Sequence, residues 1–149
     1  MLVARGHEHW QQAADWQARR IAADSSAGLN EYCRLGELLV RLGELARGEL
    51  AFLTALEREP YSYAAHRNLG QLYRRRMLWP QARAHLEFAV RYFPDNDPYI
   101  YASLAEVYRA MGDATAANRI LRKGMRIFPG NADLRRLPPT THSAPALPR

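Results

Sequence analysis

The chain has 149 residues, about the size of one domain, and its one cysteine excludes a disulfide framework and a cysteine-rich zinc site. Its 48% hydrophobic and 24% charged residues are typical of a folded globular chain. The net charge of +6 is a modest excess that disfavours nucleic acid as a partner. No apolar run reaches the ~20 residues of a membrane span and no secretory signal is evident, so we expect a cytoplasmic protein.

Residues 1–28 predict a helix followed by a linker. The helical pattern runs over residues 9–23, and its apolar positions recur at helical spacing, with the stripe formed by Trp10, Ala14, Ala18 and Ile21. Aligned with the units that follow, this segment corresponds to the second helix of a repeat. We therefore expect an N-terminal half-repeat whose first helix is missing.

Three similar units follow, over residues 29–62, 63–97 and 98–131. A bulky residue and a small one recur in register as Leu35-Gly36, Leu69-Gly70 and Leu104-Ala105. Each unit ends at a proline, and these are Pro60, Pro94 and Pro129. Two helical stripes fill each unit, with turns expected at Gly43 and Gly112 and with Asp113 as an N-cap.

The C-terminal residues are less regular. Asn131 is expected to cap a short helix over residues 132–137, which Pro138-Pro139 ends. Residues 138–149 are rich in Pro, Ala and Thr and predict a flexible tail. Because terminal repeats need polar caps, a half-repeat at one end and a short helix at the other predict an exposed apolar strip. A second copy, the tail or the rest of a longer protein could cover it.

The recurring Leu-Gly, Tyr, Ala and Pro positions resemble the tetratricopeptide repeat (TPR) family. The resemblance implies an all-α, right-handed superhelical solenoid of stacked antiparallel helix pairs. It would contain three full repeats, a partial N-terminal repeat and a short C-terminal cap. Three positions depart from the pattern, and we expect these departures to weaken local packing: Gly48, His66 and Gly124.

The resemblance also implies a peptide-binding groove lined by the first helix of each pair. The candidate residues, carried over position by position, are Asn30, Glu37, Arg41, Arg67, Asn68, Gln71, Arg74, Arg75, Tyr99, Glu106 and Arg109. Cys33 and Ser103 also fall at lining positions. The central arginines favour an acidic or carboxylate-bearing peptide, although a solvated arginine face explains them equally well. The family's chaperone-binding members grip a C-terminal carboxylate with a Lys, Asn and Arg set, of which only Asn68 is matched here.

Charge changes sign along the chain. Residues 29–62 carry four arginines and six acids, whereas residues 63–97 carry six arginines and three acids, and residues 98–131 five cations and two acids. The asymmetry indicates a directional partner or self-association.

No catalytic constellation is evident in the sequence. His7 and His9 cannot share a helical face, and no third metal ligand follows nearby. We therefore expect no enzyme activity, no cofactor and no metal. The expected function is a non-catalytic interaction module, scaffold or adaptor. Two alternatives stay open: an oligomerisation or scaffold fragment of a larger protein, and an RNA-binding helical-repeat protein.

Overall fold

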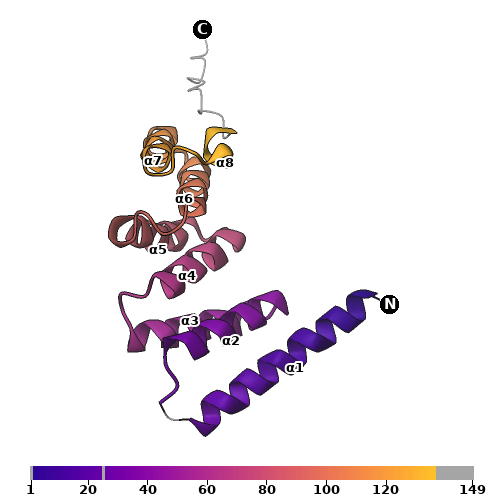
Figure 1. Ribbon diagram of the computed structural model, residues 1–149. Helices are drawn as coiled ribbons and strands as arrows, with labels where there is room; N and C mark the ends of the chain where they lie inside the picture. The colour runs from indigo at the N-terminus through magenta and orange to yellow at the C-terminus, as the bar shows by residue number, and fades with distance from the viewer. Residues whose placement is uncertain (1, 25, 137–149) are drawn as a thin grey trace. The chain divides into compact units, whose positions relative to one another are not determined.

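A computed structural model describes residues 2–24 and 26–136, which are entirely helical apart from turns and short connections (Figure 1). The chain is an all-α solenoid built from antiparallel helix pairs, and the described part contains no strand. Its helices are α1 (Leu2–Ala23), α2 (Leu29–Arg41), α3 (Leu45–Arg58), α4 (Tyr63–Arg75), α5 (Trp79–Tyr92), α6 (Tyr99–Ala110), α7 (Ala114–Ile127) and α8 (Ala132–Arg136). The tail expected over residues 138–149 lies outside the described residues. Two compact units divide the chain, residues 1–72 and residues 73–149.

In the first unit, α2 and α3 pack closely because glycines remove side chains at their contact. A Cβ atom built on Gly36 would lie 2.5 Å from Cε1 of Phe52, and one on Gly48 would lie 2.7 Å from Cγ2 of Val40. The expectation that Gly48 weakens packing is therefore wrong, because alanine does not fit there. Phe52 is almost fully buried by this contact.

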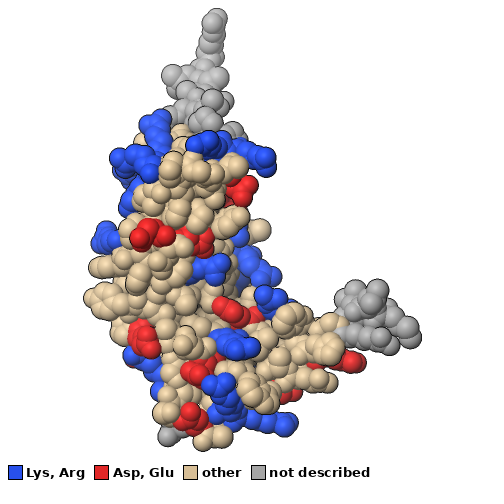
Figure 2. Space-filling model, in the orientation of Figure 1, with Lys and Arg blue, Asp and Glu red and all other residues tan. Residues whose placement is uncertain are grey.

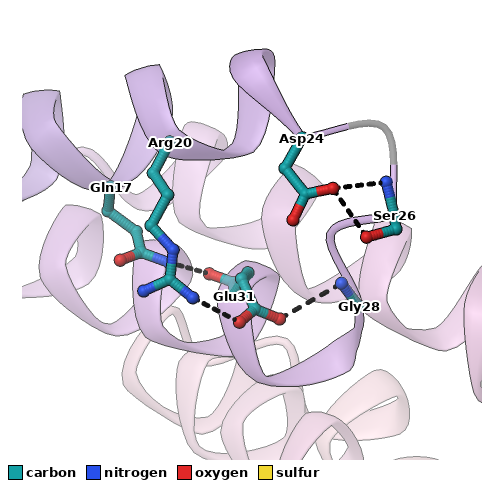
Figure 3. Close-up of polar contacts among 6 residues, drawn as sticks. All are labelled: Gln17, Arg20, Asp24, Ser26, Gly28 and Glu31. Carbon is teal, nitrogen blue, oxygen red and sulfur yellow. Dashed lines mark hydrogen bonds and ion pairs between the residues drawn. The ribbon is translucent and has the colours of Figure 1, made fainter.

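Helix α1 is held against the start of α2 by a set of polar contacts around Glu31 (Figure 3). Gln17 Nε2 donates to the Glu31 carbonyl oxygen at 3.2 Å, and Arg20 Nη2 donates to Glu31 Oε1 at 2.9 Å. The other carboxylate oxygen of Glu31 accepts from the Gly28 N–H at 3.1 Å and so caps α2. In the loop, Ser26 donates from N and Oγ to Asp24, and these bonds lower the pKa of that carboxyl.

The apolar stripe expected on α1 is shifted. Ala14 is buried as expected, but the neighbouring buried residue is Gln17, at 1% exposure. Trp10 remains 40% exposed, and the Arg41 guanidinium from α2 lies 4.7 Å from its ring centroid. A cation on an aromatic face thus replaces the apolar burial expected at this position.

In the second unit, the core gathers around α6. Tyr101 is fully buried, its hydroxyl donates to the Pro94 carbonyl at 2.7 Å, and its ring meets Phe128 edge-on. A Cβ atom on Gly124 would lie 2.8 Å from Tyr101, so the weakening expected at this glycine is also wrong. Leu134 of α8 is buried and lies close to Gly124. The caps expected at Asp113 and Asn131 are present, accepting from the N–H groups of Ala116 and Leu134.

Candidate functional site

Six of the expected groove residues lie on α2 and α4 within the first unit, and none of them is buried. They are Asn30, Glu37, Arg41, Arg67, Asn68 and Gln71. Asn68 Nδ2 donates to Glu37 Oε1 at 2.9 Å, which links α4 to α2. Arg41 stacks on Trp10, as described above, so it is drawn toward α1.

The other five lie in the second unit, on the last turn of α4 and on α6. Arg74 and Glu106 form an ion pair with an Nη1–Oε2 distance of 2.5 Å, so the sequence-predicted arginine cluster carries its own counter-charge. Arg75 is exposed, whereas Arg109, one turn after Glu106 on α6, is partly buried. Within this unit, the contact with Glu106 that the structure shows is that of Arg74.

Tyr99 is the aromatic residue of this group and is 57% exposed. Its hydroxyl donates to Asp133 Oδ2 of α8 at 3.2 Å. That hydrogen bond, with the negative charge of Asp133, raises the pKa of the phenol. The hydroxyl end of the side chain is therefore held in place, while more than half of the residue stays exposed.

Two residues expected at lining positions are not available for binding. Cys33 is only 6% exposed, and burial, followed by the charges of Glu37 and Glu59, raises the pKa of its thiol to about 11. Ser103 is buried within α6. The remaining candidates are the eleven that the sequence favoured.

The histidines at the repeat positions have structural roles. His66 is buried, and its Nε2 lies 3.0 Å from the Pro60 carbonyl oxygen. Burial lowers the pKa of this imidazole, which favours the neutral ring. His85 stacks on Tyr73 with ring centroids 5.6 Å apart.

Neither a metal cluster nor a membrane span is found among residues 2–24 and 26–136. No three His, Cys, Asp or Glu side chains of this part gather as metal ligands. None of its helices combines the length and apolar character that crossing a membrane requires.

Sequence reasoning missed a group of cations on the outer face of α7. The charge counts given above include Arg119, Arg122, Lys123 and Arg126 only in the total for residues 98–131. Their spacing of three and four residues was the available signal, because it places all four on one side of a helix.

No protein-family model and no curated protein sequence matches this chain. Solved structures do match it in fold. The structure of MamA is 19% identical with a TM-score of 0.77, and the match covers 87% of this chain and 75% of that one. YrrB, described as a TPR protein with an unusual peptide-binding site, is 17% identical with a TM-score of 0.73, covering 85% of this chain and 64% of that one.

A third match is the first TPR of Spaghetti (RPAP3), determined with the HSP90 peptide SRMEEVD bound. It is 14% identical with a TM-score of 0.66, and the match covers 72% of this chain and 84% of that one. At these identities the likeness is one of fold. The chain therefore has the TPR-like fold that its repeating positions predicted.

Proposed function

We propose that this chain is a non-catalytic protein-interaction module that binds an acidic segment of a partner protein on the exposed faces of its first helices. The supporting observation is the group of arginines on α4 and α6 of the second unit, Arg74, Arg75 and Arg109. Arg74 is paired with Glu106, Arg75 is exposed, and the exposed ring of Tyr99 lies on the same helix as Arg109. Guanidinium groups form forked, charge-assisted hydrogen bonds with carboxylates, which suits an acidic chain.

The fold favours the same reading. Two structures of this fold are described with a peptide-binding site or with a bound peptide. Of the Lys, Asn and Arg set of the chaperone-binding members, only the Asn position is matched here, by Asn68, and none of its cations is present, so the proposed ligand is acidic along its length rather than held by its terminal carboxylate.

The ion pair between Arg74 and Glu106 gives the proposal a two-sided test. An acidic ligand has to compete with Glu106 for the Arg74 guanidinium. Removing the Glu106 charge with Glu106→Gln should therefore tighten binding by about two- to fivefold. This factor corresponds to the free energy that an exposed ion pair contributes. Arg75→Glu should weaken binding by about tenfold or more, because it replaces an attractive charge with a repulsive one.

The measurement is fluorescence anisotropy with a labelled peptide of alternating Glu and Asp, beside the same peptide with Gln and Asn. Arg91→Glu, on the exposed side of α5, is the matched control for Arg75→Glu. Circular dichroism confirms that each variant stays helical. Equal binding of both peptides, or unchanged binding by both variants, overturns the proposal. Sedimentation of the free chain as a dimer, with no peptide bound, would favour the oligomerisation alternative.

A further inference from the structure

The second helices of the repeats share a set of outward positions, which the sequence register aligns 34 or 35 residues apart. We name these positions by their residues in each helix. They are Trp16, Arg19, Arg20 and Ala23 in α1; Leu50, Leu53, Thr54 and Glu57 in α3; Ala84, Glu87, Phe88 and Arg91 in α5; and Arg119, Arg122, Lys123 and Arg126 in α7. All four positions are cationic only in α7.

The four cations of α7, named here the α7 stripe, lie on its solvent side. Arg119, Arg122 and Arg126 are exposed and Lys123 is partly exposed. The stripe extends over the eight residues 119–126, or about 10 Å of helix. An open hollow along this face is lined by the stripe together with Thr115 and Asn118. Figure 2 shows blue side chains gathered at the end of the molecule where α7 and α8 lie.

Carboxylates of the described part do not neutralise the stripe. Among the described residues, none of its four cations forms an ion pair with a carboxylate. Glu87 of α5 and Arg119 both act on the Tyr108 phenol, so one acid lies in the neighbourhood of the stripe. Glu87 is already engaged, since it accepts from the Tyr108 hydroxyl at 2.5 Å and lies 3.7 Å from Arg83 Nε. Its charge is therefore shared.

Solubility alone does not account for this arrangement. The outward face of α3 holds one acid and no cation. The outward face of α5 holds one acid and one cation. The outward residues of α3 are exposed to a similar degree as those of α7, and the face of α1 holds two arginines rather than four cations. Four like charges on adjacent turns repel one another and destabilise a helix by a few tenths of a kcal/mol per pair. A polyanionic ligand would remove that repulsion.

We propose that the α7 stripe binds the phosphate backbone of duplex DNA without reading its sequence. Arginine, lysine, threonine and asparagine are the side chains that contact phosphate, and α7 presents all four types on one face. Two more exposed arginines, Arg135 and Arg136, follow on α8. The whole-chain charge of +6 understates this surface because acids elsewhere offset it, and six of the 15 acids lie in residues 29–62.

The surroundings of the stripe favour a duplex over other anionic partners. The large hydrophobic side chains exposed in the described part include none within the stripe, so it lacks the aromatic anchors of a protein hot spot. Ala116, Ala117, Leu121 and Gly124 on the apolar side of α7 are buried against the core, and α7 contributes none of the large hydrophobic side chains exposed in the described part, which a lipid-binding helix would need. Single strands need aromatic platforms for base stacking, and the stripe offers none.

Fluorescence anisotropy with a labelled DNA duplex tests this assignment, using the full chain. With four phosphate contacts, the logarithm of the association constant should fall against the logarithm of salt concentration with a slope of about −3 to −4. The variant Arg122→Glu/Arg126→Glu should lose at least about a hundredfold in affinity at low salt, because two contacts are lost and two repulsions are added.

The register supplies a matched control. Arg19→Glu/Arg91→Glu changes the same outward positions on α1 and α5 and lowers the net charge by the same four units. This control should bind the duplex within about threefold of the unchanged chain, as expected where only long-range charge is altered. Both variants should retain the acidic-peptide binding proposed above, so the two proposals fail separately.

Three outcomes overturn the proposal. They are equal losses in the two double variants, tighter binding of the single strand than of the duplex, and stripe-dependent binding only to vesicles containing anionic lipid. A loss confined to the stripe variant, with the expected salt slope, supports it.

Discussion

At the scale of single residues, the glycines inside α3 and α7 are the least intuitive feature of this chain. Gly48 and Gly124 stand where the repeat pattern favours alanine, and helix propensity alone predicts a loss of stability from each. The structure places Val40 Cγ2 and the Gly36 carbonyl oxygen 2.7 and 3.1 Å from a Cβ on Gly48. The backbone oxygen cannot move aside as a side chain can, so the close approach of α2 and α3 favours glycine at position 48.

Gly48→Ala should therefore destabilise the chain by about 1–2 kcal/mol, since overpacking costs more than the propensity gained. Gly6→Ala is the control, because nothing lies within 4 Å of a Cβ at that position of α1. It should stabilise by about 0.5–1 kcal/mol or leave stability unchanged. Urea unfolding followed by circular dichroism measures both. Stabilisation by Gly48→Ala would show that α2 and α3 separate easily.

At the scale of elements, three turns between paired helices share one geometry. Gly43, Met77 and Gly112 each adopt a positive φ, of 84°, 57° and 81°. In each turn the next residue donates back to a carbonyl five residues earlier, as in Leu78 N to Tyr73 O at 2.9 Å. This is the Schellman arrangement that ends a helix, and it favours glycine.

Met77 is the exception, because a methionine at positive φ carries backbone strain. Its side chain is 71% exposed and contributes little burial. Met77→Gly should therefore stabilise the chain by about 0.5–1 kcal/mol, the strain relief being partly offset by the greater freedom of unfolded glycine. The control is Met111→Gly, which truncates an exposed methionine at φ −83°. If both variants destabilise equally, the strain at Met77 is negligible.

These turns show what the sequence could predict about the fold. Gly43 and Gly112 indicated their turns directly, because glycine is the residue that positive φ selects. The turn at Met77 has no glycine, and its signal in the sequence is Trp79-Pro80, which breaks the helical run and places a proline in the first turn of α5. The antiparallel helix pairs followed from the same register, since repeated apolar stripes have to be buried against neighbours.

The candidate site was less predictable than the fold. Helical spacing correctly indicated which side chains share a face, but it could not indicate their partners on other helices. The Arg74–Glu106 ion pair joins residues 32 apart, and the Asn68–Glu37 bond joins residues 31 apart. Such contacts depend on how far long side chains reach across a packed interface. The α7 stripe was missed for a different reason. The net charge of a segment adds the charges on all faces of its helices, so it does not show that four cations lie on one face.

At the scale of the whole molecule, a repeat architecture predicts that stability is local. Each helix pair contacts only its neighbours, so its stability is approximately its own plus the interface terms beside it. The two crowded glycines make this testable, because Gly48 lies in α3 of the first unit and Gly124 in α7 of the second. They have the same chemistry and similar crowding, and they differ mainly in position.

Gly48→Ala should lower amide-exchange protection in α2 and α3 by about five- to thirtyfold, which corresponds to 1–2 kcal/mol, and leave α6 and α7 nearly unchanged. Gly124→Ala should do the reverse, because its Cβ would crowd Tyr101 at 2.8 Å and Leu134 at 3.2 Å. Hydrogen exchange read by mass spectrometry resolves both sets of helices in each variant. Equal loss everywhere in both variants would mean that the helices unfold as one cooperative body. If each variant instead loses protection only in the helices around its own glycine, stability is local. A ligand bound to either unit would then stabilise mainly the helices that it contacts and their immediate neighbours.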